Sequence, residues 1–186
     1  MSKSPETIIE VTIQNRMGFH VRPVQRFAEL ARAFQCELEV ELRGRRVPGK
    51  SILHLMSLAG RPGDRLKIIA RGSDAEQCTG VLRILADDHF FVEDELKAEE
   101  RPLRHIQRLC DIASCFRSKI EAVLNGKVAD AKDFEALKDL GLSPASEPEF
   151  RIAGEDAPQA RAVLEALSRC CFYVEQSMVE KRRKAQ

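Results

Sequence analysis

"NRMGFHVRPVQRFAELARAF", residues 15–34, contains a glycine-centred loop followed by an amphipathic segment. From residue 22 to residue 34 the apolar side chains recur every three or four positions, which predicts a helix with one buried face. Gly18 permits a tight backbone turn just before this helix. The pattern therefore places His20 at, or immediately before, the N-terminus of a helix.

The segments that follow continue the mixture of strands and helices. Residues 6–14 and 36–44 alternate between apolar and polar side chains and are rich in β-branched or apolar types, so both are predicted strands. A turn, a short strand at 45–47, a short helix beginning at Ser51, a strand at 65–71 and a helix over 73–88 complete the unit. The predicted order is β-α-β-β-α-β-α, which belongs to the α+β class.

The same pattern returns after a gapless shift of 82 residues. This shift aligns CELEVELRG, from Cys36, with SKIEAVLNG, from Ser118, and it also superimposes the glycine pairs Gly44/Gly126 and Gly72/Gly154. One register maintained over so many positions predicts a tandem duplication. We therefore expect two units, residues 1–95 and residues 96–186. The first strand of the second unit is the weak point, because only residues 89–97 are left for it, and that stretch is equally suited to extend the preceding helix.

Composition and charge restrict the class of protein. The 186 residues are 44% hydrophobic and 32% charged, as in globular proteins, and the formal net charge is +1, so we expect no nucleic-acid partner. No run approaches the roughly 18 to 20 apolar residues of a membrane span, and the N-terminus lacks a signal-peptide core. The six cysteines form no CxxC pair and predict reduced thiols in the cytoplasm. The four histidines lack metal-ligand spacing, so we expect no metal ion and no cofactor.

His20 is the strongest candidate for chemistry. The first N–H groups of a helix have no intrahelical acceptor, and the helix dipole adds partial positive charge there. A phosphoryl group on the imidazole would be stabilised in this position, and the Arg22 guanidinium is close enough in sequence to approach its oxygens. Pro23 tolerates the first helical turn because its missing N–H is not needed. The alternative is that His20 only caps the helix.

Two segments resemble one protein family. GFHVRP and the helix after it resemble the active-site segment of HPr, the histidine-containing phosphocarrier of the bacterial phosphoenolpyruvate-dependent sugar phosphotransferase system. GKSILHLMSLAGRPGDRLKIIARGSDA, residues 49–75, resembles the second signature of that family in the same frame. The resemblance covers about residues 6–95. It implies an HPr-like open-faced β-sandwich, an antiparallel four-stranded sheet covered by helices, here in two tandem copies.

The resemblance also implies a function. His20 would accept a phosphoryl group from phosphorylated Enzyme I and pass it to an enzyme IIA-type acceptor. Such a protein is a phosphoryl carrier with a transient phosphohistidine rather than a stand-alone enzyme. Arg22 would be the electrostatic partner of the phosphoryl group, and Pro23 would fix the first helical turn. The docking surface of the family corresponds to Phe19, Leu53 and Met56.

Ser51 matches the regulatory serine of the family, the target of a dedicated serine kinase and phosphorylase. A serine before an apolar helix is also a good N-cap, and this structural role is the alternative. Val21 and Val24 stand where the family usually has alanine, and His54 stands where it commonly has glycine. These departures leave the partner open. A second interpretation is therefore a regulatory binding module that signals through Ser51 phosphorylation or protein docking, without sugar transport.

The second unit has lost the candidate nucleophile. The 82-residue shift places Pro102 at the position of His20 and Asp133 at the position of Ser51. We expect Asp133 to be a helix N-cap and His105 to be a surface or partly buried residue. The scaffold evidently tolerates the absence of the imidazole, so a capping role explains His20 poorly.

Overall fold

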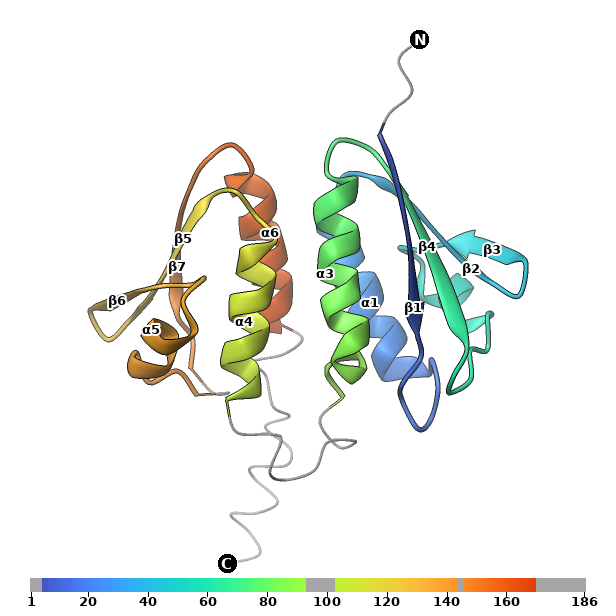
Figure 1. Ribbon diagram of the computed structural model, residues 1–186, viewed down its shortest axis with the longest axis horizontal. Helices are drawn as coiled ribbons and strands as arrows, with labels where there is room; N and C mark the ends of the chain where they lie inside the picture. Colours follow the sequence, from blue (N-terminus) through green and yellow to red (C-terminus); the bar gives the residue numbers. More distant parts are fainter. Residues whose placement is uncertain (1–4, 93–102, 144–145, 170–186) are drawn as a thin grey trace, which may run out of the picture.

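Two β-sheets enclose a central layer of helices in the computed structural model (Figure 1). The structure describes residues 5–92, 103–143 and 146–169. We call residues 5–92 the N-terminal unit and the other two ranges the C-terminal unit. The four long helices of the two units lie back to back between the sheets (Figure 1).

The N-terminal unit is an open-faced antiparallel sandwich. Its four strands are arranged in the order β1-β4-β2-β3, every neighbouring pair is antiparallel, and helices cover one face. This confirms the fold class that the sequence predicts. The elements are β1 (Glu6–Thr12), α1 (Val21–Arg32), β2 (Glu37–Leu42), β3 (Arg45–Pro48), α2 (Ile52–Met56), β4 (Arg65–Arg71) and α3 (Ala75–Asp87).

Apolar and polar side chains alternate along the strands, and this alternation decides which face of the sheet the helices cover. In β2 the side chains of Leu38, Val40 and Leu42 are buried, whereas the glutamates between them face away from the core. Val40 pairs with Ile68 of β4, which is also fully buried. Because side chains alternate across a strand, one apolar set per strand is enough to build the helix-facing core.

The C-terminal unit repeats the element order from α1 onward. Its three strands are arranged in the order β6-β5-β7. β5 and β6 begin and end 82 residues after β2 and β3, which is the same shift that aligns the two halves of the sequence. The elements are α4 (Arg104–Ser114), β5 (Lys119–Leu124), β6 (Lys127–Asp130), α5 (Phe134–Asp139), β7 (Glu149–Ala153) and α6 (Ala157–Leu167).

The repeat predicts that the first strand of the second unit begins near residue 89, but the structure has no strand at residues 89–92. α3 ends at Asp87, and the next residues form a 3₁₀ turn, η1 (His89–Phe91), that is neither a strand nor a continuation of the α-helix. All three η1 residues have positive φ angles, far from the φ of about −120° to −140° that is typical of strands. Residues 93–97 lie outside the described residues. Within those residues the second sheet therefore has three strands where the first has four.

Equivalent positions of the two units make equivalent contacts. Lys50 Nζ donates to the Phe34 carbonyl at 2.6 Å, and Lys132 Nζ, 82 residues on, donates to the Phe116 carbonyl at 2.6 Å. The turns after β2 and β5 each contain a glycine with a φ of 78°. The shared sequence positions thus carry shared structural roles.

An aspartate, buried in the N-terminal unit and half-buried in the C-terminal unit, ties a helix to a strand in both units. The Asp74 carboxylate accepts hydrogen bonds from the backbone N–H groups of Gln35 at 2.6 Å and Cys36 at 2.8 Å. The Asp156 carboxylate accepts the equivalent bonds from the two N–H groups that precede β5, at 2.7 and 2.8 Å. Each carboxylate therefore fixes the start of its last helix against the entry to a strand.

This tie makes the stability of the C-terminal unit pH-dependent. Partial burial opposes the charge on Asp156, but hydrogen bonds from the Ser118 hydroxyl and from the backbone N–H groups of Arg117 and Ser118 outweigh it and lower the pKa of this carboxyl. A lowered pKa in the folded state stabilises the fold above the unfolded value of about 4, and this contribution is lost as the pH falls through the folded-state pKa. We expect Asp156→Asn to lose less stability than the wild type during acidification below about pH 4.

Urea unfolding at a series of acidic pH values measures this difference. Glu155→Gln, which removes an exposed neighbouring carboxylate, is the control. Equal slopes of stability against pH for Asp156→Asn and the wild type would contradict the prediction.

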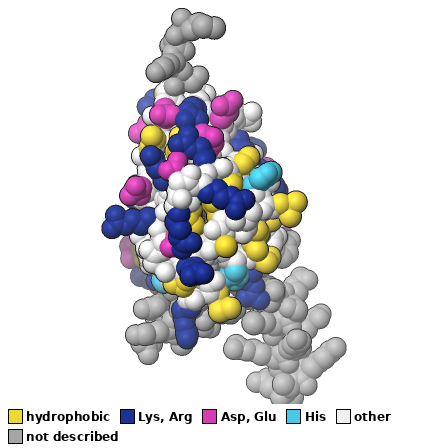
Figure 2. Space-filling view, turned by 90° about the vertical axis from the view of Figure 1, so that its right-hand side faces the viewer, with side chains coloured by type: hydrophobic (Ala, Val, Ile, Leu, Met, Phe, Trp, Pro, Cys, Tyr) yellow, Lys and Arg dark blue, Asp and Glu magenta, His cyan; other side chains and the backbone are white. Residues whose placement is uncertain are grey.

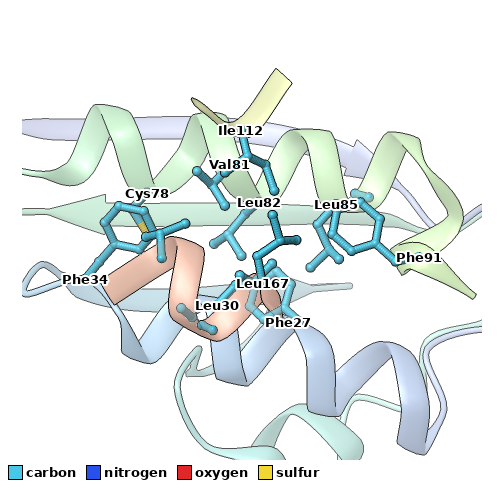
Figure 3. Close-up of a cluster of buried hydrophobic side chains, with 14 of the residues drawn as sticks. Phe27, Leu30, Phe34, Cys78, Val81, Leu82, Leu85, Phe91, Ile112 and Leu167 are labelled. Atoms are coloured by element: carbon cyan, nitrogen blue, oxygen red, sulfur yellow. The ribbon is translucent and has the colours of Figure 1, made fainter. Parts of the chain in front are cut away.

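The two units share one buried apolar cluster (Figure 3). Ile112 of α4 and Leu167 of α6, both essentially inaccessible to solvent, lie among side chains of α1 and α3. The Gln159 side chain of α6 also donates to the Ala33 carbonyl at 2.6 Å. Burial of apolar surface and this hydrogen bond hold the units together.

Other expectations concern cysteines and membranes. Cys36, Cys78, Cys110 and Cys115, the cysteines within the described ranges, are free thiols. None of the helices in those ranges is both long and apolar enough to cross a membrane.

Candidate phosphorylation site

The loop between β1 and α1 is held in one conformation by backbone contacts. Gly18 has a φ of +72°, and a Cβ atom there would lie 2.4 Å from the Gly60 carbonyl oxygen, so only glycine fits. The Asn15 carbonyl accepts the Gly18 N–H at 2.9 Å, and the Phe19 N–H donates to the Gly60 carbonyl at 2.9 Å. This loop delivers the chain to His20 at the start of α1.

His20 occupies the N-cap position of α1, but its side chain does not cap the helix. The His20 carbonyl accepts the first helical hydrogen bond, from the Val24 N–H at 3.0 Å, whereas the imidazole makes no capping hydrogen bond. The ring is half-buried, and its Nε2 atom is buried with no hydrogen-bond partner among the described residues. Of the two ring nitrogens, Nε2 is thus one that the surrounding protein encloses.

Arg22 and Pro23 lie in the first turn of α1, as predicted. Arg22 is exposed, whereas the Pro23 ring is buried. Proline leaves no backbone donor unsatisfied in a first turn. The remaining N–H groups of this turn and the positive end of the helix dipole favour an anion beside His20.

Phe19 is a core residue, which corrects the prediction that it belongs to the docking surface. Its side chain is 3% exposed. The ring meets Phe27 edge-on, with centroids 5.8 Å apart, and lies 5.2 Å from the ring centroid of Phe90. Burial of an aromatic ring against other rings stabilises the fold, so Phe19 anchors the loop before His20 to the core.

Leu53 and Met56 lie on α2, which packs against α1. Leu53 is 81% exposed and Met56 is half-buried. Met17, three residues before His20, and Val21, directly after it, are also exposed, and neither is among the predicted docking residues. The sequence does carry a sign of this exposure, because both side chains are apolar and precede the predicted helix, so neither belongs to its buried face. Figure 2 shows hydrophobic side chains gathered near histidine side chains on this side of the molecule.

The Ser51 hydroxyl does not cap α2, although the residue occupies the N-cap position. Its Oγ atom lies 2.9 Å from His54 Nδ1 instead. In the C-terminal unit, Asp133 accepts a hydrogen bond from the Ala136 N–H at 3.1 Å, which confirms the predicted cap. The expected capping role is therefore realised by Asp133 and not by Ser51.

This difference predicts unequal costs of substitution. Ser51→Ala removes only an exposed side-chain contact, and we expect the free energy of unfolding to change by no more than about 0.5 kcal/mol. Asp133→Ala removes a capping hydrogen bond and is expected to cost about 1 kcal/mol. Urea unfolding of the two variants measures both values. A cost for Ser51→Ala that equals that of Asp133→Ala would contradict the assignment.

His105 is more buried than expected. It lies in the first turn of α4, its side chain is buried, and its Nε2 atom lies 2.9 Å from the Leu142 carbonyl oxygen. This hydrogen bond links α4 to the segment after α5, so the imidazole has a structural role.

Comparison with known proteins places this site in a family. The model described as "PTS HPr component phosphorylation site" matches residues 8–87, which include His20 and Ser51. The phosphocarrier protein HPr of Borreliella burgdorferi is 37% identical over 67 residues, which cover 36% of this chain and 78% of the relative. HPr of Neisseria meningitidis is 32% identical and is covered to 90%, over 43% of this chain. The chain belongs to the HPr family.

The HPr region occupies only part of longer relatives. The phosphoryl donor subunit DhaM of the phosphoenolpyruvate-dependent dihydroxyacetone kinase of Escherichia coli is 35% identical over 88 residues, which cover 47% of this chain and 19% of that protein. The chain spans no more than 20% of the length of the first three curated relatives it matches. The crystal structure of HPr-C-His from Thermoanaerobacter tengcongensis is 32% identical, with 45% of this chain and 94% of that chain covered and a TM-score of 0.44.

Proposed function

We propose that the protein is a cytoplasmic phosphocarrier in which His20 accepts a phosphoryl group from phosphorylated Enzyme I and passes it to an acceptor protein. The observation that carries this proposal is the imidazole at the start of α1, within the HPr region, with no capping role and with Nε2 buried.

The exchange needs no cofactor and no metal ion. The lone pair of His20 Nδ1 attacks the phosphorus atom carried by phosphorylated Enzyme I, and the new N–P bond forms as the bond between phosphorus and Enzyme I breaks. The backbone N–H groups of the first turn of α1 and the Arg22 guanidinium stabilise the negative oxygens. In the transfer to the acceptor, the His20 N–P bond breaks as a bond between phosphorus and the acceptor forms. The His20 imidazole thereby regains its lone pair.

Two classes of acceptor are candidates. An enzyme IIA-type protein is the acceptor that the HPr family implies. The similarity to DhaM, which is named as the phosphoryl donor subunit of a phosphoenolpyruvate-dependent dihydroxyacetone kinase, favours a kinase of that kind as the second candidate. The exposed side chains of Leu53, Met17 and Val21, together with the half-buried Met56, are the docking surface we propose for donor and acceptor.

Regulation at Ser51 is the second candidate function. Its hydroxyl is not used as a cap and lies beside an exposed imidazole, that of His54. Phosphorylation by a serine kinase would add a charge of about −1.5 to −2 next to Leu53, which disfavours docking of an acidic or apolar partner. A phosphorylase would reverse this change.

We propose that the C-terminal unit is a degenerate HPr-like copy, with the boundary at residues 95–96. The shared strand positions, the equivalent lysine contacts and the equivalent aspartates support a duplication. Proline in place of the histidine makes this unit silent in phosphoryl transfer.

Labelling with radioactive phosphoenolpyruvate and Enzyme I of the same organism tests the proposal. We expect an acid-labile label on the tryptic peptide that contains His20, and we expect an enzyme IIA-type protein or the dihydroxyacetone kinase to remove it. A wild-type protein that stays unlabelled would overturn the phosphocarrier function. A label that neither acceptor removes would favour the regulatory module.

A further inference from the structure

The 3₁₀ turn η1 has an unusual backbone. Its successive residues His89, Phe90 and Phe91 have φ angles of 49°, 53° and 57°. A side chain with a Cβ atom disfavours this left-handed region, and a run of three such residues persists only when its surroundings hold it. Phe90 and Phe91 are both buried, so the turn is enclosed by protein on two sides.

On one side η1 is held by the loop that carries the candidate phosphorylation site. The Asn15 side chain, which is fully buried, donates from Nδ2 to the His89 carbonyl at 2.8 Å. Arg26 Nη1 of α1 donates to the Phe90 carbonyl at 3.2 Å. Phe19, the residue before His20, packs its ring against that of Phe90. The turn therefore supports both ends of the loop from Asn15 to His20.

On the other side η1 is held by the C-terminal unit. The carboxylate of Asp88, just before the turn, accepts hydrogen bonds from Arg104 Nη1 and Arg108 Nε of α4. Arg108 is 3% exposed, and its guanidinium carbon lies 4.7 Å from the ring centroid of Phe91. A charge pair buried in this way is strongly sensitive to the loss of one partner, because the remaining charge has no water to solvate it.

We propose that Arg108 is a positioning residue for phosphoryl transfer at His20. Arg108 holds Asp88 and Phe91, these hold the left-handed turn, and the turn holds Asn15 and Phe19 on either side of Gly18. The C-terminal unit, which has no phosphorylatable histidine at the equivalent position, acts on the reaction through this contact. The expected effect on the rate of phosphorylation rests on the proposed phosphocarrier function. The expected effect on the position of the His20 ring rests on the contacts alone.

Two variants and a control test this inference. Arg108→Met keeps an apolar stem over Phe91 but removes the charge, and Arg108→Lys keeps the charge but loses the planar fork. Arg117→Met, at an exposed arginine of the C-terminal unit, is the matched control. The readouts are the ring chemical shifts of His20 in the free protein, the initial rate of phosphorylation by Enzyme I, and the thermal midpoint.

We expect Arg108→Met to shift the His20 ring signals and to lower the rate roughly tenfold, because small displacements of a reacting group have large kinetic effects. Arg108→Lys should recover part of the rate, and Arg117→Met should match the wild type. A lower thermal midpoint with unchanged ring signals and unchanged rate would overturn the positioning role.

Asp88→Asn, which keeps the shape of the side chain, replaces Arg108→Met if that variant does not fold. Its outcomes decide the proposal in the same way. A wild-type protein that Enzyme I does not label would reject the phosphocarrier function, and the ring signals, which need no Enzyme I, would still test the positioning.

Discussion

Replacing His20 by alanine is expected to abolish phosphorylation by Enzyme I and phosphoenolpyruvate, with a loss of roughly a thousandfold or more, because the attacking atom is removed. The fold should be unaffected. The imidazole makes no capping hydrogen bond, and the backbone contacts that shape the loop come from Gly18, Asn15 and Gly60. We expect the free energy of unfolding to change by no more than about 0.5 kcal/mol.

His105→Gln is the matched control for this experiment. Glutamine retains a side-chain N–H that can donate to the Leu142 carbonyl, and the position lies in the C-terminal unit. We expect this variant to be labelled like the wild type. Residual acid-labile label on His20→Ala would show that a different imidazole is the phosphoryl acceptor.

Replacing Ile112 by alanine is expected to lower the free energy of unfolding by about 2–5 kcal/mol, because the side chain is fully buried and leaves a cavity. Ile112 belongs to α4 but points toward side chains of α3 (Figure 3). The apolar cluster is continuous across both units, so we expect the substitution to lower the stability of both sheets.

Hydrogen exchange in urea measures this coupling directly. Amides of β2 and β4 should lose protection at the same urea concentration as those of β5 and β7, and this concentration should be lower in the variant. Val128→Ala, at a side chain of β6 that is 48% exposed, is the control and should change stability by about 0.5 kcal/mol or less. Loss of protection confined to β5 and β7 would show that the two units unfold independently.

The candidate site was predictable where local sequence decides it. Gly18, His20 and Pro23 lie within six residues of one another, and the residue types that suit a tight turn and a first helical turn are recognisable in so short a stretch. Ser51 shows the limit of such reasoning. Its residue type suits a cap, but the imidazole of His54, one helical turn away, competes for the hydroxyl, and only the three-dimensional arrangement shows which contact forms.

Phe19 and the turn η1 show a second limit. Sequence identifies Phe19 as apolar, but whether such a residue faces a partner or a core depends on what lies against it. Here Phe90, from the far end of the N-terminal unit, covers the ring. The burial of a residue follows from packing between distant segments, which no local pattern contains.

The sequence by itself predicted the order of the elements in the N-terminal unit and the buried face of β2, because periodicity and turn chemistry act over a few neighbouring residues. The tertiary structure alone decided the left-handed η1 turn in place of a strand, the contact of Asp88 with Arg108, and the packing of the two units. These features depend on residues far apart in the chain, such as Asn15 and His89, which are 74 positions apart, and Ala33 and Gln159, which are 126 apart. Contacts of this kind become favourable only once the elements have assembled and water has left the space between them.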